Sequence, residues 1–156
     1  MNMKLLVVLL ATMGFFSFMT QRSVFKVEYM SPTQAIVITN TQVVVTEYVE
    51  SYDNPMSSIP SGRTQVVKKA SLTTAQFQAL KTKLDKSGFW KLTKASYGAS
   101  EGERAYAYSI SALNGKNTKT VVYKSNPAPE TEKMPAAFDA VEKHILDLVK
   151  SISNWK

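Results

Sequence analysis

The chain has 156 residues, which suits one domain and leaves little room for two. Hydrophobic residues make up 44% of it and charged residues 20%, so the composition is that of a globular protein and excludes a disordered chain. The net charge of +7 favours anionic partners without indicating nucleic-acid binding. Cysteine is absent, which excludes disulfides, thiolate metal sites, a cysteine nucleophile and the lipid-modified cysteine of bacterial lipoproteins.

The first twenty residues differ in kind from the rest of the chain. Lys4 supplies a short positive start, and Leu5–Met19 is a charge-free, mostly apolar run of fifteen residues. As a helix with a rise of about 1.5 Å per residue, this run would be roughly 22 Å long, whereas a hydrocarbon core is about 30 Å thick. We therefore expect residues 1–20 to be an export signal peptide that precedes a single domain at residues 24–156. A short uncleaved signal-anchor remains open, because no clean Ala-x-Ala cleavage site is present.

The first half of the chain predicts four strands. Apolar residues from Phe25 to Tyr29 alternate with Lys26 and Glu28, which is typical of a half-buried strand. An Asn-Thr pair between the next two runs of β-branched residues suits a tight hairpin. Prolines, serines and a glycine then make residues 50–62 a long loop. The predicted strands span residues 24–30, 35–39, 42–49 and 63–70.

A helix is predicted for residues 73–87 by its start, its apolar face and its end. Thr73 and Gln76 have the spacing of a capping box, in which each side chain bonds to the backbone of the other residue. Gly88 suits the left-handed backbone that commonly follows a helix end. The apolar stripe, with spacings of three and four residues, comprises Phe77, Leu80 and Leu84.

The second half of the chain predicts two more strands and a second helix. Asn114-Gly115 is the strongest hairpin signal in the chain. The two strands that it joins span residues 103–113 and 120–124, between loops at residues 94–103 and 125–135. A continuous apolar seam then predicts a helix over residues 134–152. The seam comprises Phe138, Val141, Ile145, Leu148, Ile152 and Trp155.

Together these elements predict an α+β fold. Four strands precede the first helix, and two more separate it from the second. Each helix has one apolar stripe, which must be buried against another layer. We expect a single antiparallel sheet of four to six strands with both helices packed on one face.

Residues that enzymes use are sparse in this chain. His144 is the only histidine, so a histidine-based metal site or a Ser-His-Asp triad would have to be built around it. Two glutamate pairs, Glu101 with Glu103 and Glu130 with Glu132, fall in predicted solvated loops and not in a cleft. The six glycines are scattered singly, which excludes a phosphate-binding loop and a dinucleotide fingerprint. We therefore expect no catalytic activity, no cofactor and no metal.

The most uneven charge distribution lies around the first predicted helix. Residues 63–94 carry eight basic side chains and one acid, Asp85. A basic surface attracts anionic partners, and tryptophan is favoured at protein interfaces. The alternative is a helix with an ordinary solvated face. The candidate binding residues are Lys81, Lys83, Lys86, Trp90 and Lys91.

The expected partner is an anionic component of the cell envelope or an acidic protein. Nucleic acid is not expected, because the chain is predicted to be exported. Membrane contact is expected only through the N-terminal segment, and only if that segment stays uncleaved.

The segment GRTQVVKKASLTTAQFQALKTKLDKSGFWKLTKASYG resembles a family of small uncharacterised bacterial envelope or secreted domains. This domain of unknown function has the core motif "lt..qf..L…gF..L...Y", and the resemblance covers roughly residues 33–150. It implies a bacterial envelope location and an α+β fold, but no activity. Many members carry an early cysteine-proline signature and a lipoprotein cysteine, which this chain lacks. The matching residues are Gln76, Phe77, Leu80, Gly88, Phe89, Leu92 and Tyr97.

Export, the absence of catalytic motifs and the basic surface lead to one functional expectation. The protein is expected to be a noncatalytic periplasmic or secreted module that binds, or inhibits by binding, an unidentified ligand. The alternative is an accessory subunit of a membrane-associated complex, held in place by an uncleaved N-terminal segment.

Overall fold

The computed structural model describes residues 24–54, 56, 60–128 and 131–156. The predicted signal peptide or signal-anchor at residues 1–20 lies outside the described residues. Within the described ranges, no helix is long and apolar enough to cross a membrane.

The described part of the chain forms seven strands, two α-helices and one short 3-10 helix, η1. The strands are β1 (Phe25–Met30), β2 (Gln34–Thr39), β3 (Gln42–Ser51), β4 (Gly62–Ser71), β5 (Ser96–Gly98), β6 (Tyr106–Asn114) and β7 (Asn117–Ser125). The helices are α1 (Thr74–Lys86), η1 (Phe89–Lys91) and α2 (Ala136–Ser151).

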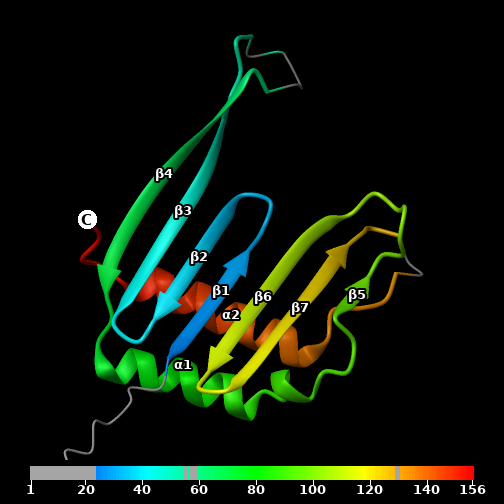
Figure 1. The fold of residues 1–156 in the computed structure, drawn as a ribbon. Coiled ribbons are helices and arrows are strands. Elements are labelled where there is room, and N and C mark those ends of the chain that lie inside the picture. The colour runs from blue at the N-terminus through cyan, green and yellow to red at the C-terminus, as the bar shows by residue number, and fades with distance from the viewer. Residues whose placement is uncertain (1–23, 55, 57–59, 129–130) are drawn as a thin grey trace, which may run out of the picture.

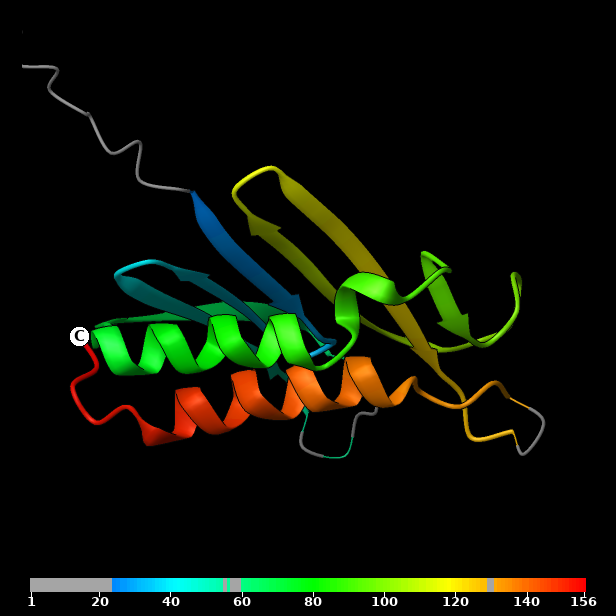
Figure 2. The same cartoon turned by 90° about the horizontal axis from the view of Figure 1, so that it is seen from below.

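All seven strands belong to one sheet, in the order β4-β3-β2-β1-β6-β7-β5 (Figure 1). Helices α1 and α2 lie side by side against one face of this sheet (Figure 2). No helix of the described residues covers the opposite face (Figures 1 and 2). The α+β class is confirmed, but the prediction of an antiparallel sheet of four to six strands is wrong. The sheet has seven strands and is mixed, because β5 runs parallel to β7.

The missed strand lies in residues 94–103, which the sequence predicts to be a loop. With three residues, β5 is too short for an alternating pattern to show. Its parallel pairing depends on Gly98, whose φ is +91°. A Cβ atom at this position would lie 2.1 Å from the carbonyl oxygen of Lys124. Glycine thus allows both the backbone conformation and the close approach to β7.

The local signals around the first helix are confirmed. Thr73 accepts a hydrogen bond from the backbone of Gln76, and the Gln76 side chain accepts one from the backbone of Thr73. Gly88, just beyond the helix, has a left-handed φ of 86°. Phe89 then turns back into the core and is fully buried.

The core lies between the sheet and the two helices. Phe25 of β1 meets Phe77 of α1 edge to face, with ring centroids 5.0 Å apart. The predicted seam of the last helix is buried from Phe138 to Ile152. Its final residue, Trp155, lies beyond the helix end and is half-buried. The largest fully buried side chains include Ile36, Ile38, Leu80, Leu84, Phe89, Ile110, Phe138 and Ile145.

Candidate binding surfaces

The three lysines predicted on α1 do not all lie on one side of the helix. Lys81 borders a hollow beside Phe25 and Phe77, at one flank of the helix. Lys83 lies on the other flank, where its charge lowers the pKa of His144 on α2. Lys86 is exposed on the outer side. Because successive helical residues are about 100° apart, Lys83 and Lys86 lie about 60° apart on one side of the helix, whereas Lys81 lies on another side.

Trp90 is half-buried on η1 and packs against the core. Its indole N–H donates to Asp85 Oδ1 at 3.1 Å, and its ring meets Phe89 edge to face. The Nζ of Lys119 donates to the backbone carbonyl oxygens of Trp90, at 2.9 Å, and of Leu92. These contacts explain the position of Trp90 through packing and hydrogen bonds within the fold.

The basic residues nearest to Trp90 in space include two that local sequence does not indicate. Lys116 and Lys119, at the β6–β7 turn, line a hollow together with Trp90. Lys91 is the exposed neighbour of Trp90 in the chain. The β6–β7 hairpin brings Lys116 and Lys119 beside Trp90 of η1. The sequence around α1 alone does not predict this contact.

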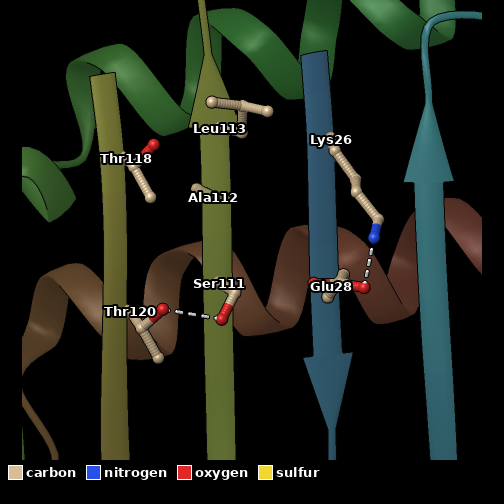
Figure 3. A pocket seen from close by; sticks show the side chains of 7 residues that line it. All are labelled: Lys26, Glu28, Ser111, Ala112, Leu113, Thr118 and Thr120. Atoms are coloured by element: carbon tan, nitrogen blue, oxygen red, sulfur yellow. Dashed lines mark hydrogen bonds and ion pairs between the residues drawn. The ribbon is translucent and has the colours of Figure 1, made fainter. Parts of the chain in front are cut away.

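The uncovered face of the sheet carries a shallow hollow of about 260 Å³ over β1, β6 and β7 (Figure 3). Lys26 Nζ lies 2.6 Å from Glu28 Oε1 in an ion pair. The hydroxyl oxygens of Ser111 and Thr120 are 2.8 Å apart and share a hydrogen bond. The polar groups of this hollow therefore bond to one another, and it is open and shallow. It has no feature that selects a small ligand.

A third surface is the outer half of the β3–β4 hairpin, residues 48–67, which we call the arm. β3 pairs with β2 only through residues 43–47, while it pairs with β4 along its whole length. From Val49 onward the hairpin thus extends past its neighbour, and Figure 1 shows it projecting beyond the rest of the sheet.

Exposed apolar side chains are concentrated on the arm. Among described residues, it holds five of the eight large hydrophobic side chains that are most open to solvent. Val67 faces the same side of the sheet as the uncovered face, and Val66 faces the other side. The arm therefore presents apolar surface on both sides. Its five exposed residues are Val49, Tyr52, Met56, Val66 and Val67.

The arm is held in shape by polar contacts along its length. Just outside the base of the arm, Lys68 Nζ lies 3.0 Å from both carboxylate oxygens of Glu47 across the two strands. The guanidinium of Arg63 lies 4.3 Å from the ring centre of Tyr48 and donates to the carbonyl oxygen of Pro32. Ser61 bonds to the carbonyl oxygen of Ser51 just below the tip. These contacts order the arm without burying its apolar residues.

The sequence predicts the ends of two strands and a long loop for these residues, but it does not indicate a site there. One signal was present in the adjacent valines of β4, since neighbouring strand residues face opposite sides. Two adjacent valines can both be buried only if both sides of the strand are covered. That the arm extends past β2 depends on strand pairing, which periodicity does not reveal.

The titratable residues form no catalytic arrangement within the described ranges. His144 is partly buried, and burial together with the charge of Lys83 lowers its pKa, so it is neutral at pH 7. Glu103 accepts a hydrogen bond from the backbone of Ser100, and Glu132 pairs with Lys94 at 2.7 Å. No three acidic or histidine side chains in the described part gather as metal ligands would. Of the predicted glutamate pairs, residue 130 lies outside the described residues.

No protein-family model matches the chain, and no curated protein matches it in sequence. The resemblance to bacterial envelope domains therefore stays a prediction that rests on the matching residues of the sequence.

Proposed function

We propose that the protein is a noncatalytic, exported binding or inhibitor-like module that contacts another protein through the arm. The observation that carries this proposal is the concentration of exposed apolar side chains on a hairpin that projects from the sheet. Exposed apolar patches on a protein surface are typical of interaction sites. Tyrosine, methionine and arginine, which are enriched at such sites, are all present on the arm.

The proposed location is the periplasm or the exterior of a bacterial cell. It is supported by the sequence of residues 1–20 and by the resemblance to envelope domains. If the N-terminal segment stays uncleaved, the protein is instead an accessory subunit of a membrane-associated complex. The poor cleavage site favours this second candidate. In both cases the arm is the proposed contact surface.

An anionic envelope component that binds the basic residues around Trp90 is a separate proposal. It is supported by the positive charge of Lys116 and Lys119, which line the hollow beside Trp90, and of Lys91, the neighbour of Trp90 in the chain. Lys81 lies on a different side of α1 from Lys83 and Lys86, so the predicted lysines do not form one patch, which favours the arm.

Affinity capture from the envelope fraction, with matched variants of the whole mature chain, tests the proposal. Val66→Lys combined with Val67→Lys removes apolar surface from the arm, and Lys83→Glu combined with Lys86→Glu reverses charge on α1. We expect the unmodified protein and the α1 variant to capture the same partner, and the arm variant to lose it. Loss of the partner by the α1 variant alone, with unchanged melting temperatures, would assign the contact to the basic surface.

A further inference from the structure

We propose that the outer edge of β4 binds an extended, acidic segment of a partner protein as an additional strand of the sheet. This inference rests on the proposed function, since it assumes that the arm contacts a protein. It adds the mode of binding, which is backbone hydrogen bonding at a sheet edge, and the charge of the bound segment.

β4 is an edge strand whose outward backbone groups can be identified from one contact. The backbone N–H of Lys69 donates to the carbonyl oxygen of Lys156, and that of Lys156 donates back to Lys69, at 3.0 and 2.9 Å. The backbone groups of Lys69 thus point away from β3. Because the backbone groups alternate in direction along a strand, the N–H and C=O groups of Arg63, Gln65 and Val67 also point to the outer side. The backbone groups of the residues between them bond to β3.

The Lys156 contact also shows that this edge can form reciprocal backbone hydrogen bonds with another segment. The pairing is reciprocal, as between opposed residues of an antiparallel ladder. Figure 1 shows the C-terminal segment beside the far end of β4, away from the arm. The remaining edge, from Arg63 to Val67, lies on the arm and has no strand beside it among the described residues. It contains no proline that would prevent pairing.

The basic side chains of β4 favour an acidic partner segment. The strand carries Arg63, Lys68 and Lys69 and no carboxylate. Lys68 is paired with Glu47, while the Arg63 guanidinium contacts a neutral ring and a carbonyl oxygen. Opposite charges on directly opposed strand residues stabilise pairing and like charges oppose it. An extended segment with acidic residues and β-branched residues, to lie beside the two valines, fits this edge.

A second copy of the chain fits the same edge less well. Antiparallel pairing of two β4 strands about Gln65 would place residue 61 of one copy opposite Lys69 of the other. That position is already taken by Lys156. The hairpin tip of the second copy would then meet the C-terminal segment of the first, an obstruction that a peptide segment lacks. Two chains of net charge +7 also repel each other.

Amide hydrogen exchange of the mature chain, measured by NMR, tests this inference with synthetic peptides. The first probe has the sequence Glu-Thr-Val-Thr-Val-Glu with blocked ends. The second replaces both glutamates with lysine. The third replaces the valine at its third position with proline. We expect the acidic peptide to slow exchange at residues 63, 65 and 67 and to leave residues 64, 66 and 68 unchanged. The affinity of the other two peptides should be lower by a factor of about ten or more.

A pair of variants separates backbone pairing from side-chain contact. Gln65→Pro removes an outward N–H that β3 does not use, and Gln65→Ala keeps it. We expect Gln65→Pro to weaken binding of the acidic peptide about tenfold and Gln65→Ala to leave it unchanged, since a hydrogen bond is lost and strand pairing is interrupted. Equal binding by both variants, or no alternating protection with any peptide, would overturn the inference.

Two further outcomes are distinct from these. Alternating protection that grows with protein concentration in the absence of peptide would show pairing of two copies and overturn the proposed occupant. The Gln65→Pro variant could capture the cellular partner while the Val66→Lys, Val67→Lys variant does not. This result would support the proposed function and refute only the inference of strand addition.

Discussion

At the scale of single residues, the contact between Tyr29 and Glu142 joins the sheet to α2. The Tyr29 hydroxyl donates to Glu142 Oε1 at 2.7 Å; Tyr29 is buried and Glu142 is half-buried. Burial raises the pKa of Tyr29, and the hydrogen bond to Glu142 raises it further. Burial also raises the pKa of Glu142, which outweighs the lowering effect of the Tyr29 hydrogen bond. The carboxylate is therefore less stable in the folded protein than in water.

This shift predicts how stability depends on pH. A carboxyl group with a raised pKa in the folded state stabilises the fold below its unfolded pKa, near 4.3, and loses that contribution as pH rises through the folded value. Glu142→Gln keeps an acceptor for Tyr29 and cannot ionise. We expect the variant to be more stable than the unmodified protein at pH 7 and to lose less stability between pH 4.5 and 7. Parallel pH profiles in thermal unfolding would contradict this assignment.

Trp90 gives a second prediction at this scale, because its contacts suggest packing and not recognition. A fully buried tryptophan costs about 3–5 kcal/mol when truncated to alanine, and a half-buried one costs about 2–3 kcal/mol by the same reasoning. We expect Trp90→Ala to lower the free energy of unfolding by this amount in denaturant. The control Lys91→Ala, at the exposed neighbour, should change the free energy of unfolding by less than about 0.5 kcal/mol. A stability loss below about 1 kcal/mol together with loss of partner binding would make Trp90 an interface anchor instead.

At the scale of elements, prediction succeeded where the signals are local. The capping box at Thr73 and the left-handed glycine at position 88 fix the ends of α1 within one residue or two. It failed for β5, whose three residues have no periodicity and whose parallel partners on β7 lie 26 positions further along the chain. Contacts between distant segments also decide which lysines lie beside Trp90.

The helix stripes make the sharpest prediction at this scale. Leu84 of α1 and Ile145 of α2 are both fully buried between helices and sheet. An aspartate at either position would place an unpaired charge in the core, which costs several kcal/mol. We expect Leu84→Asp and Ile145→Asp each to abolish cooperative unfolding in circular dichroism, while the exposed control Lys86→Asp stays folded. A folded protein in both aspartate variants would refute the assignment of these stripes to the core.

At the scale of the whole molecule, the core and the proposed contact surface lie in different parts of the fold. The two helices and the centre of the sheet form the core, while the arm extends past β2 and adds little to it. The sequence predicted the strands of the arm but not its projection, which follows from the unequal lengths of β2 and β3. Exposed apolar residues on such an extension contribute little to folding, so their concentration there calls for a contact outside the domain.

The sequence of residues 1–20 predicts where the proposed contact takes place. We expect the native protein to begin between about Phe15 and Val24 after export, as intact-mass spectrometry would measure. Recovery of intact Met1 from a membrane fraction would instead favour the accessory subunit of a membrane-associated complex.

The central claim is that the arm contacts a partner protein in the cell. Tyr52 on the arm and Tyr106 at the start of β6 are both exposed tyrosines, with 45% and 59% of their surface open, and so make a matched pair. A photoreactive phenylalanine analogue would replace each in turn in the full-length chain, expressed in its native host. Upon irradiation we expect a covalent adduct of defined mass from position 52 and none from position 106. Adducts from position 106 alone, or from neither position, would contradict the claim.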